Sequence, residues 1–139
     1  MLNLQPPEDD DLFIPEVGEW SKDKHYFLMR YIDAFTTAMK NKRWSGLHYI
    51  DLFAGAGIER LKDSKKLDWG SPLIAAQAKH SFTSLHLCEL KKEKYEALKT
   101  RVEQLHRNVQ LLHGDANEQI SVIMRCIPKG SLSLAFLDP

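Results

Sequence analysis

Four acidic side chains, Asp51, Glu89, Asp115 and Asp138, each stand at or just after the end of a short apolar segment. A carboxylate accepts several hydrogen bonds, so it can hold the hydroxyl groups of a ribose or the amino group of a base. The nearly continuous apolar character of the segments predicts strands buried on both faces, as in a parallel sheet. Because the carboxyl ends of parallel strands meet at the edge where open α/β sheets bind ligands, we expect these acids to form one site.

A turn of small residues follows the first predicted strand. Residues 48–57 read HYIDLFAGAG, and Gly55 and Gly57 can adopt positive φ angles that let a ligand approach the main chain. We expect this turn to lie outside the core, so that a side chain introduced at Gly57 would block the ligand without unfolding the chain. The predicted cofactor-binding residues of this strand and turn are Asp51, Phe53, Ala54, Gly55 and Gly57.

The sequence favours a nucleoside ligand that carries no pyrophosphate. Glu89 is predicted to accept two hydrogen bonds from a ribose, and Asp115, followed by Ala116, is predicted to lie beside an adenine. The P-loop pattern GxxxxGK[ST] is absent, and the pattern GxGxxG lacks its third glycine because Arg60 stands there. A nicotinamide-dependent oxidoreductase is therefore the disfavoured alternative.

The elements that must position these residues alternate along the chain, which predicts an α/β fold with right-handed crossovers. Apolar residues recur at helical spacing between about Ser21 and Asn41, so we expect an N-terminal helix there. Strands are expected at residues 47–54, 84–88, 109–113 and 132–137, with further helices at 71–80, about 95–105 and 120–127. Residues 58–70 are expected to be a charged connection between the first strand and the next helix. The predicted fold class is a Rossmann-like parallel sheet in the order 3-2-1-4 with helices on both faces.

Charge is distributed unevenly, although the net charge is zero. Residues 1–19 hold six acids and no Lys or Arg, and we expect them to form an acidic tail. Residues 20–139 hold all 19 Lys and Arg but only 13 of the 19 Asp and Glu, a surplus that suits a polyanionic partner such as nucleic acid. The sequence contains no apolar run near the roughly 18 residues that span a bilayer. The two cysteines form no CxxC pair, and the histidines show no ligand spacing, so we expect a cytoplasmic protein without membrane attachment or a metal site.

These motifs resemble those of class I S-adenosylmethionine-dependent methyltransferases. DLFAGAG is similar to their first motif, CEL at Glu89 to the ribose-binding acid, GDAN at Asp115 to the adenine-side acid, and AFLDP to the fourth motif. More specifically, four stretches taken together resemble the three-Cys-motif partner family. They are GEWSKDKHYFLMRYIDAF, which contains Trp20 and Lys24, HYIDLFAGAG, GSPLIAA and AFLDP. The resemblance covers about residues 17–139. It implies S-adenosyl-L-methionine as the cofactor and a three-Cys-motif protein as a candidate partner.

The resemblance also implies that Asp138 and Pro139 carry the chemistry. In amino-methyltransferases, an acid or amide followed by proline accepts hydrogen bonds from the target amine and aims its lone pair at the methyl group. The hypothesis from the sequence is a methyltransferase that acts on nucleic acid. A non-catalytic interaction module that retains the methyltransferase fold is the alternative.

The last predicted strand, LSLAFL at residues 132–137, contains no charge that would protect an open sheet edge. Class I methyltransferase sheets continue past the corresponding strand. Residues 20–139 are therefore expected to be the N-terminal part of a longer domain, truncated after its fourth strand. We expect the chain alone to self-associate through this strand and to transfer no methyl group.

Overall fold

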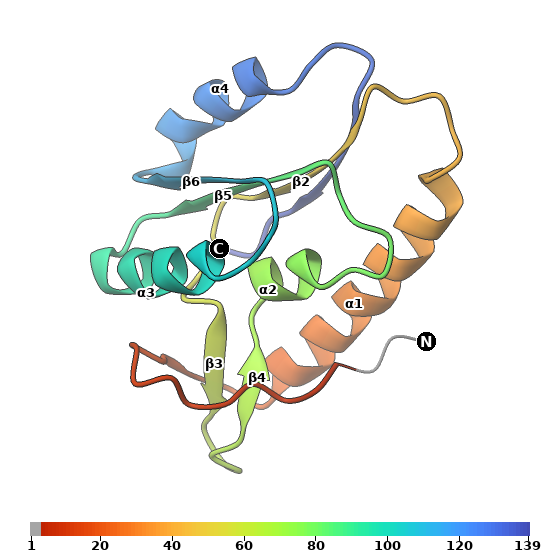
Figure 1. The fold of residues 1–139 in the computed structure, drawn as a ribbon. Helices are drawn as coiled ribbons and strands as arrows, with labels where there is room; N and C mark the ends of the chain where they lie inside the picture. Colours follow the sequence, from red (N-terminus) through yellow and green to blue (C-terminus); the bar gives the residue numbers. More distant parts are fainter. Residues whose placement is uncertain (1–3) are drawn as a thin grey trace.

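The computed structural model describes residues 4–139 as an α/β fold built around a sheet of four parallel strands (Figure 1). The strands are β2 (Leu47–Asp51), β5 (Ser84–Glu89), β6 (Val109–His113) and β7 (Leu132–Phe136). They lie in the order β6-β5-β2-β7, and the expected parallel α/β sheet is confirmed. The central strands β2 and β5 are buried along their whole length, as expected for strands that helices cover on both faces.

Helices cover both faces of this sheet. They are α1 (Trp20–Met39), α2 (Ser71–Ala76), α3 (Lys92–Glu103) and α4 (Ala116–Cys126). The first three lie on one face and α4 lies on the other (Figure 1). The main core lies beneath the first three, where the side chains of Ile32, Tyr49 and Leu98 are at most 2% exposed. Within residues 4–139, no helix combines the length and the apolar character that crossing a membrane requires.

Residues 58–70, expected only to be a charged connection, form a β-hairpin whose two strands the sequence patterns did not predict. Its strands β3 (Ile58–Leu61) and β4 (Leu67–Trp69) are antiparallel, and β3 also pairs in parallel with β1 (Glu16–Val17). Ile58 and Leu61, the first and last residues of β3, are buried. Sequence patterns missed these strands because the pairing partner β1 is distant in the sequence and most of the hairpin residues are charged or small.

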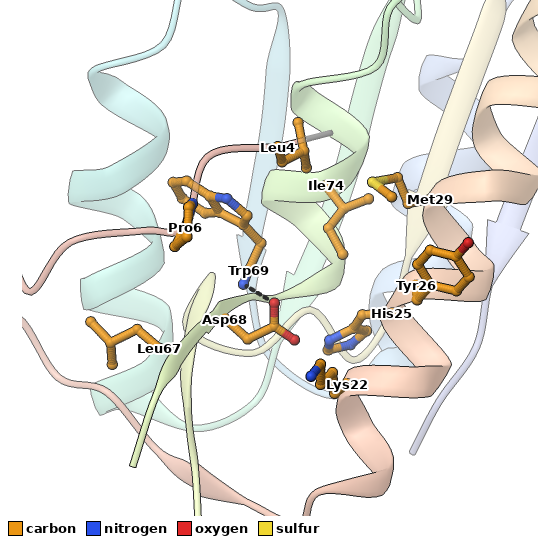
Figure 2. A pocket seen from close by; sticks show the side chains of 10 residues that line it. All are labelled: Leu4, Pro6, Lys22, His25, Tyr26, Met29, Leu67, Asp68, Trp69 and Ile74. Atoms are coloured by element: carbon orange, nitrogen blue, oxygen red, sulfur yellow. Dashed lines mark hydrogen bonds between the residues drawn. The ribbon is translucent and has the colours of Figure 1, made fainter. Parts of the chain in front are cut away.

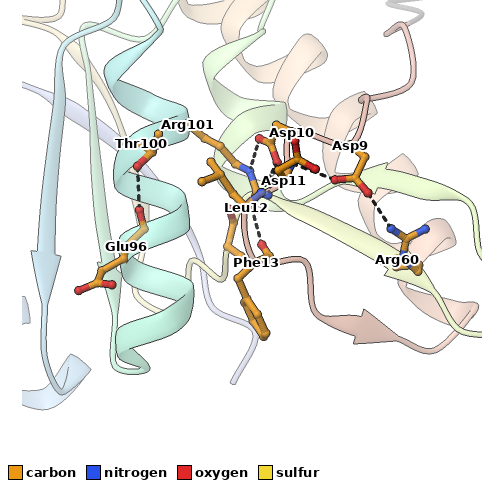
Figure 3. Close-up of polar contacts among 10 residues, drawn as sticks. Asp9, Asp10, Asp11, Leu12, Phe13, Arg60, Glu96, Thr100 and Arg101 are labelled. Carbon is orange, nitrogen blue, oxygen red and sulfur yellow. Dashed lines mark hydrogen bonds and ion pairs between the residues drawn. The ribbon is translucent and has the colours of Figure 1, made fainter.

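The described part of the acidic segment, residues 4–19, packs against the domain (Figure 3). Nε and Nη2 of Arg101, on α3, each donate a hydrogen bond of 2.8 Å to the carboxylate of Asp10. Nη1 of Arg101 donates to the main-chain oxygens of Phe13 and Ala56, at 2.9 and 2.7 Å. Arg101 is 4% exposed, and a buried guanidinium requires such partners. The expectation of a tail is wrong for these residues because one of their acids neutralises a buried cation.

The contacts of Arg101 join three parts of the chain. The residue lies on α3, and it holds both the N-terminal segment and the turn that follows β2, through the oxygen of Ala56. The same N-terminal segment continues into β1 and α1. We refer to Arg101 and Asp10 as the N-terminal clamp.

The N-terminal clamp is expected to stabilise the folded chain. Asp10→Asn is expected to lower the free energy of unfolding by roughly 1.5–3 kcal/mol, because it removes a charged hydrogen-bond acceptor from a buried guanidinium. The hydrogen bond from Arg101 lowers the pKa of Asp10. The loss should therefore be complete at neutral pH and should shrink as the pH falls through the folded-state pKa of this acid. Urea unfolding followed by circular dichroism measures both effects.

Asp9→Asn is the matched control. Asp9 forms an exposed ion pair of 3.3 Å with Arg60, and such pairs contribute about 0–1 kcal/mol. If the two variants lost the same free energy of unfolding, the clamp would have no special role.

Candidate functional site

A cavity of about 610 Å³ lies where β2, β5 and β7 end, and the first turns of α1 also line it. Its volume lies within the range of roughly 300–1,000 Å³ that is common for small-molecule sites. We call it the strand-end cavity. Several predicted site residues line it, namely Phe53, Ala54, Gly55, Glu89, Asp138 and Pro139. The structure therefore brings together residues from three strand ends, as the sequence predicts for an open α/β sheet.

Asp51 lies behind this cavity. Its side chain is fully buried, and its carboxylate accepts hydrogen bonds from the hydroxyls of Ser71 and Tyr49 and from the main-chain N–H of Phe53. Burial raises the pKa of Asp51 to about 6, although the hydrogen bond from Ser71 opposes this shift. Asp51 thus fixes the turn and the start of α2, and it does not line the cavity itself.

The two glycines of the turn have different environments. Gly55 has a φ of +76°, and a Cβ built on it would meet nothing within 4 Å. Gly57 has a φ of +93°, and a Cβ there would lie 3.0 Å from Leu73 and 3.2 Å from Leu98. Gly55 therefore faces the cavity, whereas Gly57 allows the turn to pack against α2 and α3. The expectation that the turn lies outside the core is wrong at Gly57.

Glu89, at the end of β5, forms a hydrogen bond with the turn and also lines the cavity. Its Oε1 accepts a hydrogen bond of 2.8 Å from the N–H of Gly55, and its Oε2 accepts one of 2.7 Å from the N–H of Lys91. Its side chain lines the cavity although the residue is only 6% exposed. A carboxylate has about four lone-pair positions, so Glu89 retains capacity to accept hydrogen bonds from a ligand.

Asp115 and Ala116 lie away from the cavity. The cavity extends from β5 toward β7, whereas β6, which precedes Asp115, lies on the other side of β5. Asp115 is the N-cap of α4, and its Oδ1 accepts a hydrogen bond of 2.7 Å from the N–H of Asn117. Ala116 is the first residue of that helix. Asp115 thus caps α4 and does not line the cavity, although Gly114 beside it donates a hydrogen bond of 3.1 Å to the main-chain oxygen of Glu89.

Asp138 forms an ion pair with Lys24 of α1 across the cavity wall. Their side chains are 40% and 33% exposed. An ion pair with this exposure contributes about 0–1 kcal/mol, so another cation or an amine can replace Lys24 at little cost. Trp20 lies one helical turn before Lys24 and lines the same cavity. Trp20 and Lys24, which belong to the stretch that resembles the three-Cys-motif partner family, therefore both line the strand-end cavity.

Sequence reasoning missed a polar cluster in the cavity wall. Glu59 accepts a hydrogen bond of 2.9 Å from Ser21, and its Oε2 lies 3.8 Å from Nδ1 of His25. Burial raises the pKa of Glu59 and lowers the pKa of His25 to about 4, so the imidazole is neutral at pH 7. These residues lie on α1 and β3, and only the hairpin that escaped prediction brings them together.

A second cavity has a volume of about 410 Å³. The side chains that line it come from the N-terminal segment, α1, β4 and α2 (Figure 2). Its lining is mainly apolar, and Asp68 within it accepts a hydrogen bond of 3.0 Å from the N–H of Trp69. His25 lines both cavities. Across residues 4–139, the structure contains no group of three or more His, Cys, Asp or Glu side chains suited to a metal ion.

The structure is an α/β fold with a cavity at the carboxyl ends of its parallel strands. No family model matches the sequence, and no curated protein is significantly similar to it. The structure is similar to the crystal structure of protein LPL1258 from Legionella pneumophila strain Philadelphia 1, which is assigned to the family model DUF519. The TM-score is 0.61 at 20% sequence identity, over 81% of this chain and 55% of that chain. This similarity concerns the fold, and this chain spans about half the length of that protein.

The different surroundings of the two glycines lead to a second prediction. Gly57→Ala is expected to cost roughly 2–5 kcal/mol, because the positive φ penalty adds to overlap with Leu73 and Leu98. Gly55→Ala should cost only the φ penalty of about 1–2 kcal/mol. Urea unfolding of both variants tests the assignment. Equal losses, or a larger loss at Gly55, would show that the core does not contact the turn at Gly57.

Proposed function

We propose that this chain forms the cofactor-binding part of an S-adenosylmethionine-dependent methyltransferase that acts on nucleic acid in its full-length form. One observation carries the proposal, namely the strand-end cavity in which Gly55, Glu89 and the pair Asp138-Pro139 meet from three different strand ends. The surplus of Lys and Arg in residues 20–139 supports a polyanionic acceptor.

The cavity residues fit a nucleoside with a short charged side chain. Gly55 leaves open space beside the main chain, and Glu89 can accept hydrogen bonds from ribose hydroxyls. Phe53 lines the cavity at 40% exposure and offers an apolar ring to a base or to the methyl donor. When it is bound, S-adenosylmethionine supplies a methyl group on a positively charged sulfur. The residues of the chain bind and orient the cofactor and the acceptor.

Asp138 is the group that would position the acceptor. Its carboxylate can accept hydrogen bonds from a target amino group and orient the lone pair of the nitrogen, which is catalysis by positioning. Lys24 now provides the positively charged hydrogen-bond donor beside this carboxylate. The acceptor amine would replace the ammonium of Lys24, and Pro139 would limit the space beside Asp138.

The course of the chain after the turn argues against a dinucleotide. The N–H groups at a helix N-terminus hold the pyrophosphate in dinucleotide-binding folds. Here β3 starts at Ile58, directly after Gly57, and α2 starts only at Ser71. A ligand without pyrophosphate is therefore favoured over NAD.

A non-catalytic interaction module is the second candidate, and a specific observation favours it. Both oxygens of Glu89 already accept main-chain hydrogen bonds, and Asp138 already has a cationic partner. These acids could therefore serve the fold alone, with the surface used for a partner such as a three-Cys-motif protein. Cofactor binding distinguishes the two candidates.

The third prediction concerns the cofactor. Isothermal titration calorimetry of the 139-residue chain should detect binding of S-adenosylhomocysteine and none of NAD. Glu89→Gln should weaken the binding about tenfold to a hundredfold, because it removes a charged acceptor. Glu103→Gln is the matched control, because Glu103 is exposed at the C-terminal end of α3 and lies outside the cavity.

Two outcomes would count against the proposal. A folded chain that does not bind S-adenosylhomocysteine would favour the interaction module. Equal affinities of wild type and Glu89→Gln would show that the ligand does not use the end of β5.

A further inference from the structure

The second cavity has charged and polar side chains toward one end and apolar side chains over most of the remaining wall (Figure 2). The polar end is formed by Lys22, His25 and Asp68. The apolar part is formed mainly by Leu4, Pro6, Met29, Leu67, Trp69 and Ile74. Packed protein interiors leave few voids larger than a water molecule, and about 410 Å³ is within the usual range for small-molecule sites. The cavity can therefore hold a small molecule that is polar at one end and apolar at the other.

The carboxylate of Asp68 has one oxygen available to a ligand. Its Oδ1 accepts the hydrogen bond from the N–H of Trp69, whereas its Oδ2 has no hydrogen-bond or ion-pair partner within residues 4–139. Burial raises the pKa of Asp68, although the N–H of Trp69 and the ammonium of Lys22 oppose this shift. A half-buried carboxylate with so few donors favours a ligand that carries a positively charged donor, because such hydrogen bonds are the strong ones.

The ammonium of Lys22 supplies the opposite charge at the same end of the cavity. It acts on Asp68 through space, but the two side chains form no ion pair with each other. Within the described residues 4–139, the ammonium also has no hydrogen-bond partner. The flexible stem of a lysine lets its charge follow an anionic group. A ligand can therefore place a cation at Asp68 and an anion at Lys22.

The apolar part of the wall is held in place by the fold. The indole Nε1–H of Trp69 donates a hydrogen bond of 2.6 Å to the main-chain oxygen of Gln5, which ties β4 to the N-terminal segment beside Leu4 and Pro6. Ile74 of α2 is 4% exposed and belongs to the main core. An apolar group can therefore enter a wall that already exists, so that little binding energy is lost to ordering the protein.

We infer that the second cavity binds a free α-amino acid with a large apolar side chain. The ammonium of this ligand would bind Oδ2 of Asp68, and its carboxylate would bind Nζ of Lys22. Its side chain would lie among Met29, Trp69 and Ile74. An apolar amine would leave Lys22 unused, and a carboxylic acid without an ammonium would meet the negative charge of Asp68. The two opposite charges beside an apolar wall therefore favour a zwitterion over either of these ligands.

Isothermal titration calorimetry of the 139-residue chain with L-phenylalanine tests this inference. N-acetyl-L-phenylalanine, which lacks the ammonium, and L-phenylalaninamide, which lacks the carboxylate, should each bind about tenfold to a hundredfold more weakly. Asp68→Asn should weaken the binding of L-phenylalanine by a similar factor without weakening that of N-acetyl-L-phenylalanine. Lys22→Gln should weaken the binding of L-phenylalanine without weakening that of L-phenylalaninamide. Asp63→Asn is the matched control, because Asp63 is exposed on the same hairpin and lies outside the cavity.

The indole signals of the ¹⁵N-labelled chain locate the ligand. The Nε1–H signal of Trp69 should shift when L-phenylalanine is added. The signals of Trp20 and Trp44 should stay in place, because these residues do not line the second cavity. Circular dichroism establishes that the variants are folded.

Three outcomes would overturn the inference. The first is a folded chain that does not bind L-phenylalanine, or that binds it equally well after Asp68→Asn. The second is equal binding of L-phenylalaninamide, because the ligand would then be an amine and Lys22 would have no role. The third is a set of shifts confined to Phe53 and Gly55, which would place the ligand in the strand-end cavity. None of these measurements uses S-adenosylhomocysteine, so each result is independent of the proposed function.

Discussion

The buried carboxylate of Asp51 determines the geometry of the strand-end cavity. It stands at the end of the central strand β2 and has no contact with solvent. A buried charge without partners costs several kcal/mol, and here three donors offset that cost. Those donors come from β2, from the turn and from the first residue of α2, so one side chain fixes the relative positions of three elements. The turn can then leave the sheet at a defined angle and present Gly55 to the cavity.

The turn is also held from two other directions. Glu89 of β5 accepts the N–H of Gly55, and Arg101 of α3 donates to the oxygen of Ala56. Through Arg101, the turn is coupled to Asp10 and hence to the N-terminal segment, which continues into the part of α1 that lines the cavity. Two of the strand-end acids, Asp51 and Glu89, thus organise the main chain of the turn, and Glu89 also lines the cavity.

Sequence patterns predicted the elements that have a recognisable pattern within their own residues. The apolar runs of β2, β5, β6 and β7 identified the parallel sheet, and the helical spacing of apolar residues identified α1. The sequence could not indicate the hairpin of β3 and β4, because it depends on pairing with β1, or the bond between Arg101 and Asp10, which are 91 positions apart. It correctly placed Gly55, Glu89 and Asp138 in one cavity. It could not show that Gly57 faces the core, since that contact depends on how the turn packs against α2 and α3.

The central claim is that the strand-end cavity is a nucleoside cofactor site, and an NMR titration of the ¹⁵N-labelled chain with S-adenosylhomocysteine tests it most directly. The claim predicts that the amide signals of Gly55 and Lys91, whose N–H groups are bound to Glu89, shift together with those of Phe53 and Asp138. The signals of α4, which covers the other face of the sheet, should stay in place (Figure 1). No shifts at saturating ligand, or shifts confined to the second cavity around Trp69, would contradict the claim.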